Sequence, residues 1–269
     1  MKVKNPHRVK PHADVRLSRI SSSETGAYSS EDQAESDLQD HLLRMDKLQE
    51  RLAASAQNAM LVVLQGMDTG GKDGTIRHIF AGVNPQGCTV TSFKVPTPLE
   101  LRHDFLWRAH LAVPPKGVIG IFNRSHYEDV LVVRVHKQIS DKEAHQRMQE
   151  IVDWEGMLAA NGVVILKFFL HISQDEQTRR LAARLDDPNK QWKISESDFA
   201  ERKLWPDYQR AYQDVLNRTS RKHAPWFIIP ADHKWYRNVV ISQVIVEALE
   251  NLKMKYPKPT VDIKKLKLD

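Results

Sequence analysis

A glycine-rich segment near residue 70 has the composition and spacing of a phosphate-binding loop. The sequence GMDTGGKDG at 66–74 contains the pattern G-x-x-x-x-G-K, after an apolar run at 60–64 and before a helical pattern that reaches Phe80. Glycines let the backbone curl so that N–H groups point inward, and the following helix adds partial positive charge. A turn that only reverses the chain is the alternative, which the flanking strand and helix disfavour. The residues expected to contact phosphate are Gly66, Thr69, Gly70, Gly71, Lys72, Asp73 and Gly74.

Two carboxylates distinguish this segment from an ordinary phosphate-binding loop. Asp73 replaces the Ser or Thr that usually follows the lysine and holds magnesium, and Asp68 lies within the loop. A bare carboxylate beside bound phosphates would be repelled, so we expect Asp68 to bind a divalent cation that bridges it to phosphate oxygens. Asp73 either stabilises the start of the helix or joins the metal site, and the sequence leaves both alternatives open.

A second group of polar residues, FNRSHYED at 122–129, follows another apolar run. Ligands of a parallel sheet bind at the C-terminal ends of its strands, so this group should face the loop. Arg124 can clamp phosphate oxygens, and Asn123 can orient metal-bound water or phosphate. Glu128 can act as a metal ligand or a general base. His126 is expected to be a packed, hydrogen-bonded histidine rather than a ligand.

A third group lies beyond the apolar run at 163–171. Arg180 and Arg184 are four residues apart, on one face of a helix, and Lys193 follows in a polar turn. We interpret residues 174–206 as a lid that brings positive charge to bound phosphate and excludes water. Such a cluster is otherwise a solvated charged face, but the phosphate loop nearby favours the lid.

The second half of this segment contains a helix start and several aromatic residues. Ser195-x-x-Asp198 resembles a capping box that opens a helix. The aromatic residues are expected to pack the lid helices rather than to stack on bases. They are Trp192, Phe199, Trp205, Tyr208 and Tyr212.

Short apolar strands that alternate with helical segments must position these three groups. Nearly continuous apolar runs are typical of strands that are covered on both faces, as in a parallel sheet. The expected strands are Met60–Leu64, Thr89–Val95, Val118–Phe122, Val163–His171 and Trp226–Pro230. The expected helices are Glu31–Ala56, Leu99–Leu111, Ala144–Ala160 and Gln174–Leu185. The pattern predicts one α/β domain with a five-stranded parallel sheet flanked by helices.

Composition limits the class of protein and its surroundings. The chain has 269 residues, 41% hydrophobic, and a net charge of +6 from 40 Lys and Arg against 34 Asp and Glu. Its single cysteine excludes an internal disulfide, and no apolar run reaches the length of a membrane span, so we expect a cytoplasmic protein. Residues 1–30 and 253–269 are expected to be a basic arm with a linker and a basic tail around a domain at 31–252. We expect loosely ordered termini, with binding by them as the alternative.

Taken together, the motifs G-x-D-x-x-G-K-D-G, F-N-R-S-H-Y-E-D and R-x-x-x-R-x-x-x-P-x-K-x-W-K-x-S resemble those of the second family of polyphosphate kinases. The resemblance runs in order from about Leu38 to Leu249. It implies a P-loop kinase fold like that of thymidylate kinase and reversible phosphoryl transfer between inorganic polyphosphate and nucleotides. It also implies dependence on Mg²⁺, or on Mn²⁺ in its place, and a homo-oligomer such as a dimer or tetramer.

Many members of that family have F-D-R-S-W-Y-N-R where this chain has Asn123, His126, Glu128 and Asp129. The difference resembles the class III members, which accept both AMP and ADP, and it makes Glu128 the carboxylate expected to tune the choice of acceptor. We therefore expect Asp68, Lys72, Arg124, Glu128 and Arg180 to be catalytic. Arg124, Arg184 and Lys193 would join the loop in binding polyphosphate, and Asn123 and Glu128 would bind an adenine or guanine nucleotide.

Two other functions compete with this prediction. An ATP-dependent nucleotide or metabolite kinase could share the fold, but Asp73 and the density of cations in the lid argue against it. A non-enzymatic nucleic-acid-binding protein would fit the basic termini. However, the chain contains no helix-turn-helix, zinc finger or basic aromatic platform, so no specific nucleic acid is expected.

Overall fold

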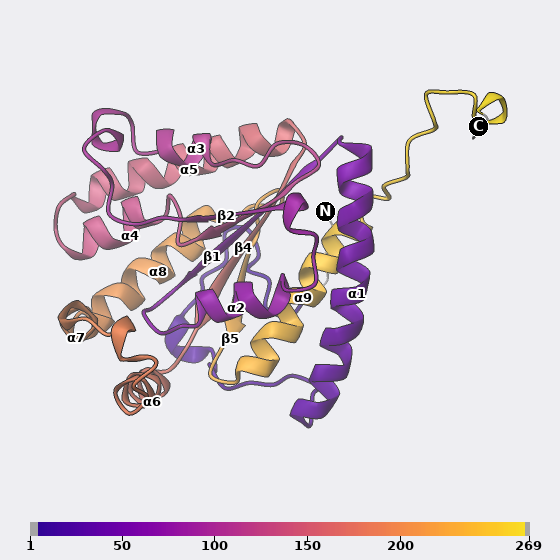
Figure 1. The fold of residues 1–269 in the computed structure, drawn as a ribbon. Coiled ribbons are helices and arrows are strands. Elements are labelled where there is room, and N and C mark those ends of the chain that lie inside the picture. Colours follow the sequence, from indigo (N-terminus) through magenta and orange to yellow (C-terminus); the bar gives the residue numbers. More distant parts are fainter. Residues whose placement is uncertain (1–4, 267–269) are drawn as a thin grey trace.

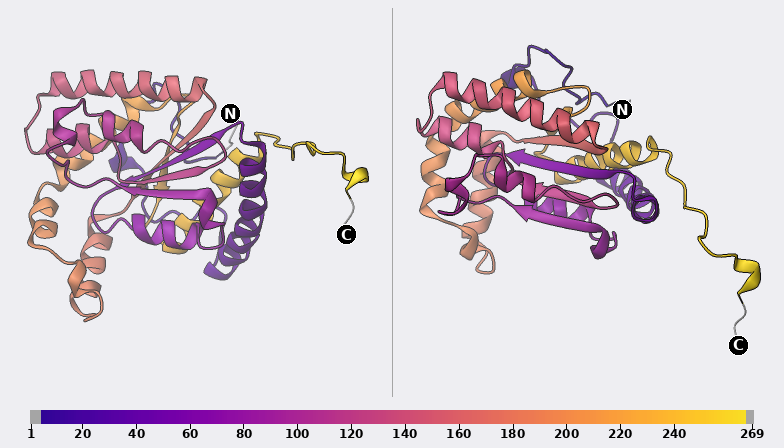
Figure 2. Two further views of the ribbon diagram at one scale, coloured as in Figure 1. Left: turned by 45° about the horizontal axis from the view of Figure 1, so that its top comes forward. Right: turned by 90° about the horizontal axis from the view of Figure 1, so that it is seen from above.

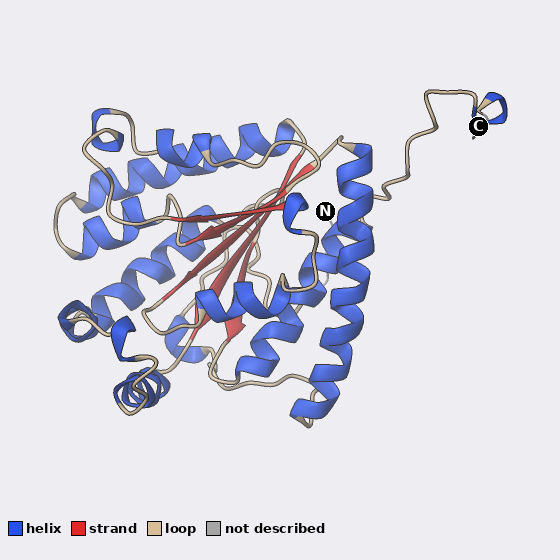
Figure 3. Cartoon of the chain, viewed as in Figure 1, coloured by secondary structure: helices blue, strands red, loops and turns tan. Residues whose placement is uncertain are grey.

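The computed structural model describes residues 5–266 and confirms the predicted parallel sheet. Its strand order is β2-β3-β1-β4-β5, and all neighbouring strands are parallel (Figures 1 and 3). The strands are β1 (Ala59–Gly66), β2 (Cys88–Ser92), β3 (Ile119–Asn123), β4 (Val163–His171) and β5 (Trp226–Pro230). Every residue of β1 is buried, as expected for the central strand of a sheet that is covered on both faces.

Helices cover both faces of the sheet (Figure 2). The first face carries α1 (Glu31–Ser55), α2 (Lys72–Ile79) and α9 (Lys234–Glu250); α2 and α9 contact the sheet and each other, and α1 packs on α9. The second carries α4 (Glu128–Val135), α5 (Asp141–Ala160) and α8 (Trp205–Thr219), with the short α3 (Trp107–Leu111) nearby. The helices α6 (Gln174–Leu185) and α7 (Glu196–Lys203) lie beyond the end of the sheet. Within residues 5–266, no helix is both long and apolar enough to cross a bilayer.

The region between β2 and β3 differs from the prediction. The strand expected at 89–95 ends at Ser92, and the helix expected over 99–111 forms only as a single turn at Glu100–Arg102 and as α3. Local hydrogen bonds explain the break, because the Asp104 carboxylate accepts from the Leu106 backbone N–H at 3.0 Å. An acidic side chain bound to the backbone two residues ahead competes with the helical pattern of hydrogen bonds.

The N-terminal arm is packed against the sheet, so the prediction of a loose terminus was wrong for its described part. The Val9 N–H donates to the Trp226 carbonyl at 2.9 Å, and Arg8 pairs antiparallel with Phe227 on β5. Val9 and Leu17 are buried in the core, and the arm covers a strand edge that would otherwise be open. Lys2 and Lys4, two of the arm's cations, lie outside the described residues. The described part of the C-terminal tail extends away from the body (Figure 1).

A fully buried ion pair lies under the second face of the sheet. Lys167 Nζ on β4 donates to the Glu155 carboxylate on α5 at 2.5 Å, and neither side chain is exposed. The lysine also donates to the Tyr127 hydroxyl at 2.9 Å, and that hydroxyl donates to Glu155 at 2.9 Å. Burial opposes ionisation of Glu155, but Lys167 and His126 still hold the pKa of this carboxyl below its ordinary value. The network fixes Tyr127, the residue immediately before α4.

We expect Glu155→Gln to destabilise the protein by about 3–5 kcal/mol, because it leaves the Lys167 ammonium buried without its counter-charge. The free energy of unfolding in urea measures the effect. Glu150→Gln, on an exposed position of the same helix, makes the same change of charge and should alter stability little. A loss below about 1 kcal/mol for Glu155→Gln, within the range of exposed pairs, would contradict the role of this pair.

Candidate active site

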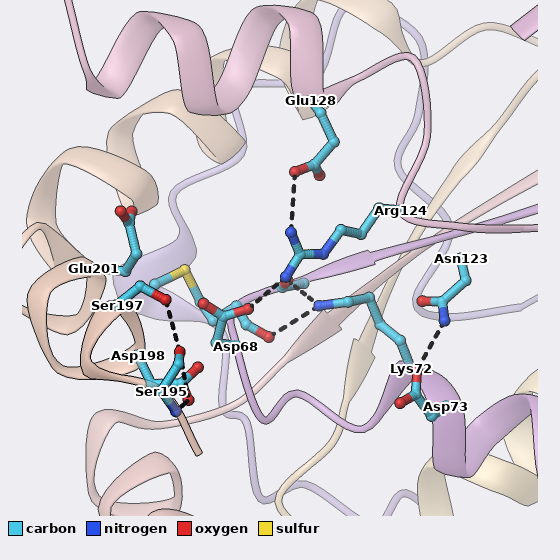
Figure 4. A network of polar contacts seen from close by, with 12 residues as sticks. Asp68, Lys72, Asp73, Asn123, Arg124, Glu128, Ser195, Ser197, Asp198 and Glu201 are labelled. Atoms are coloured by element: carbon cyan, nitrogen blue, oxygen red, sulfur yellow. Dashed lines mark hydrogen bonds and ion pairs between the residues drawn. The ribbon is translucent and has the colours of Figure 1, made fainter. Parts of the chain in front are cut away.

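Parallel pairing brings the three predicted groups of residues to one end of the sheet. The loop at 66–74 begins where β1 ends, and the Arg124 N–H at the end of β3 donates to the Leu64 carbonyl of β1 at 3.1 Å. Arg124 has a positive φ of 58°, an uncommon conformation for a side chain of this size. Figure 4 shows the side chains from the loop, from β3 and α4, and from α7 turned toward one another.

Lys72 is bound to its own loop. Its Nζ donates to the carbonyls of Gly66 at 2.7 Å and Met67 at 3.2 Å, and the side chain is buried. Burial lowers the pKa of Lys72, and Arg124 contributes in the same direction, against the opposing effect of Asp68. The ammonium group is therefore held at the loop before any ligand arrives.

A chain of ion pairs joins the loop to α4. The Arg124 guanidinium lies 3.0 Å from the Asp68 carboxylate and 3.9 Å from that of Glu128 (Figure 4). Burial raises the pKa of Glu128, although Arg124 and Lys72 oppose the shift. Arg124 thus stands between a carboxylate of the loop and one of α4.

Asp73 and Asn123 contact each other across the loop. Asp73 lies in the first turn of α2, a position that matches its predicted alternative at the helix start. Its carboxylate accepts a hydrogen bond from the Asn123 amide at 2.7 Å, which ties this turn to the end of β3.

Two cavities meet at Asp68 and Arg124. The first, of about 740 Å³, contains the loop and is rich in cations, whereas the second, of about 340 Å³, is rich in carboxylates. The charged residues of the first are Asp68, Lys72, Asp73, Lys94, Arg124, Arg184, Lys193 and Asp198. Those of the second are Asp68, Arg124, Glu128, Asp198, Glu201 and Arg202. The arrangement offers one chamber suited to a polyanion beside another with a different balance of charge.

Arg180 does not line either cavity, contrary to its predicted position on the inner side of a lid. It is buried behind the loop, where its guanidinium donates to the Glu176 carboxylate at 2.6 Å and to the Thr69 carbonyl at 2.9 Å. Arg184, one helical turn farther along α6, does line the cavity with the loop, as Lys193 does. The difference arises because α6 begins packed near the end of β4 and then extends past the sheet.

In the segment 174–206 the predicted helix start is present, but the predicted packing of two aromatic residues is wrong. The capping box of Ser195 and Asp198 is confirmed. Trp192 and Phe199 were expected to pack between the lid helices, but 77% and 42% of their surfaces are exposed. Trp192 instead lines the cation-rich cavity. The other three aromatic residues, Trp205, Tyr208 and Tyr212, pack on the core as expected.

Gln177 is the main residue of the site that the prediction missed. Its side-chain amide donates to the Asp68 carbonyl at 3.1 Å and accepts from Arg202 at 2.7 Å, so it connects the loop to α6 and α7. Its position could have been found from helical spacing, because Gln177 lies on the same face of the helix as Arg180 and Arg184. Lys94, which lines the cation-rich cavity, had no comparable signal, because it lies in an irregular segment.

The parallel sheet and the glycine-rich loop after its central strand define a P-loop kinase fold. The model of the family polyphosphate kinase 2 (PPK2) matches residues 28–257, and the chain belongs to this family.

Named relatives and a solved structure agree with this assignment. The chain is 49% identical over 264 residues to an AMP/ADP-polyphosphate phosphotransferase of Meiothermus ruber, with 98% of this chain and 99% of the relative covered. It is 47% identical over 245 residues to an ADP-polyphosphate phosphotransferase of Rhodopseudomonas palustris, with coverages of 87% and 85%. The crystal structure of polyphosphate kinase 2 from Arthrobacter aurescens TC1 has a TM-score of 0.91 and 38% identity, over 97% of each chain.

We expect Gly71→Ala to disrupt the loop. Gly71 has a φ of +97°, which strains any residue with a side chain, and a Cβ there would lie 2.0 Å from Nη1 of Arg237, so the buried guanidinium must also shift. Backbone strain of this kind costs about 1–3 kcal/mol, which should lower the thermal midpoint and abolish most activity. Gly82→Ala is the control, because nothing lies within 4 Å of its Cβ and its φ is not positive. Equal behaviour of the two variants would contradict this view of the loop.

Proposed function

We propose that this protein transfers phosphoryl groups reversibly between inorganic polyphosphate and AMP or ADP. The names of its relatives support the substrates. The observation that carries the proposal is the pair of cavities that meet at Asp68 and Arg124, because a donor and an acceptor must meet at one point for transfer. An ATP-dependent kinase of the same fold remains the rival function.

In this proposal polyphosphate lies in the cation-rich cavity. Lys72 and the backbone N–H groups of the loop would bind the reacting end, and Arg184 and Lys193 would bind phosphates farther along the chain. The segment 174–206 would act as the lid of a domain at 31–252, closing these cations onto the polyanion and excluding water. Arg180 would contribute by holding the loop through Thr69 rather than by touching phosphate.

The acceptor nucleotide would enter the carboxylate-rich cavity with its terminal phosphate toward Arg124. That phosphate is already anionic at neutral pH, so the reaction needs no strong base, and direct transfer needs no covalent intermediate on the enzyme. Glu128 lines this cavity and would determine the space and the negative charge beside the bound acceptor nucleotide. Asn123, held by Asp73, would orient a phosphate group of the nucleotide at the end of β3.

The residues present fit a magnesium ion that is held largely by substrate. Within the described region, no group of three or more His, Cys, Asp or Glu residues is arranged to hold a metal, so the protein alone offers few ligands. Mg²⁺ commonly binds through one or two carboxylates plus phosphate oxygens, which matches a single loop carboxylate, Asp68, between the two cavities. When bound there, Mg²⁺ or Mn²⁺ would neutralise charge on the transferring phosphates.

The decisive assay contains long-chain polyphosphate, Mg²⁺ and one acceptor nucleotide, AMP, ADP, GMP or GDP, without ATP. We expect AMP to yield ADP and ADP to yield ATP as the products are resolved over time. Phosphorylation that occurs only when ATP is the donor would favour the ATP-dependent kinase instead. Salt-sensitive binding of DNA without any phosphotransfer would favour the nucleic-acid-binding alternative.

We expect Lys72→Met and Asp68→Asn each to lower kcat by about a thousandfold, because each removes charge that stabilises the transferring phosphates. Lys47→Met and Asp46→Asn, at exposed positions on α1, are the matched controls and should leave turnover unchanged. The rate is followed as ATP formed from polyphosphate and ADP at saturating Mg²⁺. If Asp68→Asn keeps a near-normal rate, the assignment of the metal to this carboxylate is wrong.

A further inference from the structure

Arg237 lies directly behind the phosphate-binding loop. It belongs to the first turn of α9, a helix that contacts α2 (Figure 1). Only 2% of the surface of Arg237 is exposed. Its Nη1 is 2.0 Å from the place of a Cβ on Gly71, and its Nη2 is 3.7 Å from the corresponding place on Gly74. The guanidinium therefore occupies space that only glycine at position 71 leaves free.

No carboxylate of the described residues neutralises this guanidinium. Its Nε and Nη2 both donate to the side-chain carbonyl oxygen of Asn238, at 3.1 and 2.9 Å. Within residues 5–266, no carboxylate oxygen forms an ion pair with it at 4.0 Å or less. Burial, with a further contribution from Arg180, lowers the pKa of Arg237 to about 9, so the group is charged at neutral pH at a cost in free energy.

Two other buried cations of the described structure, Lys167 and Arg180, have a carboxylate partner, whereas the buried Lys72 donates to two backbone carbonyls of its own loop. Lys167 is paired with Glu155, and Arg180 with Glu176. Buried charges are normally paired in this way, because an unpaired charge in a medium of low polarity is strongly unfavourable. The missing anion of Arg237 is therefore the feature that requires an explanation.

We propose that Arg237 is a positioning residue for polyphosphate, and that its counter-anion is the phosphate bound on the opposite side of the loop. This inference rests on the proposed function. The loop is thin at Gly71, where no side chain separates the guanidinium from the phosphate side. The positive charge of Arg237 is weakly screened across this thin layer of backbone. It therefore raises the affinity of the loop for an anion, although the guanidinium does not touch that anion.

The test compares Arg237→Met with Arg237→Lys, and uses Arg77→Met on the exposed side of α2 as a control for net charge. Arg237→Met should unfold at the wild-type temperature or above when no ligand is present, because it removes an unpaired buried charge. Its KM for long-chain polyphosphate should rise about tenfold, and the increase in thermal midpoint that polyphosphate causes should shrink accordingly. Arg237→Lys keeps the charge and should keep KM near the wild-type value, and Arg77→Met should resemble the wild type.

A structural role for Arg237 predicts different results. Arg237→Met with a lowered thermal midpoint but a wild-type KM and polyphosphate response would overturn the inference. If Arg237→Met does not fold, Arg237→Lys decides the question, since a tenfold loss of affinity despite the retained charge would also overturn it. Failure of the proposed function is separate, because then the wild-type protein itself shows neither transfer from polyphosphate nor a polyphosphate-dependent rise in its thermal midpoint.

Discussion

The parallel pairing of β1 with both β3 and β4 is the constraint on which the rest of the site depends. In this register Leu64 lies beside Asn123, and Gly66 lies beside Leu170. The three strands therefore end within a few residues of one another, and the loop after β1, the start of α4 and the start of α6 are brought together. A Cβ on Gly66 would lie 2.9 Å from the Leu170 carbonyl oxygen, so the close approach of β4 also requires glycine at the end of β1.

Concentrating cations at this end of the sheet creates repulsion that the protein must offset before a ligand binds. It does so in three ways. Lys72 donates to loop carbonyls, and Arg124 forms an ion pair with Asp68. Arg180 forms an ion pair with Glu176 and also donates to the Thr69 carbonyl. Each arrangement also fixes a part of the loop, so electrostatic compensation and preorganisation come from the same contacts.

Much of the fold could be predicted from the sequence, because its strands are almost continuous apolar runs. The expected β4 and β5 agree with the structure at both ends, as does the helix at 174–185. The segment after β2 could not be predicted, because its course depends on local hydrogen bonds such as that from Leu106 to Asp104 rather than on periodicity.

The sequence predicts the chemical types of the site residues better than it predicts where their side chains lie. Helical spacing placed Arg180 and Arg184 on one face, but only the packing of α6 against the end of the sheet shows that Arg180 turns behind the loop. The exposed position of Trp192 likewise contradicts what its apolar character suggests. Arg237 gave no signal at all, because an isolated arginine at the start of an apolar helix is usually a surface residue.

The N-terminal arm has a consequence for the order of folding. Its partners lie far along the chain, since the Val15 N–H donates to the Asn217 side chain across a separation of 202 residues. During synthesis the arm leaves the ribosome long before α8 and β5, and it has nowhere to dock until they have formed. Closing so long a loop is slow, and the arm should therefore be added late. Ser22 then donates to Asp232, whose carbonyl accepts from Arg180, so the last segment to dock also completes the support of the phosphate-binding loop.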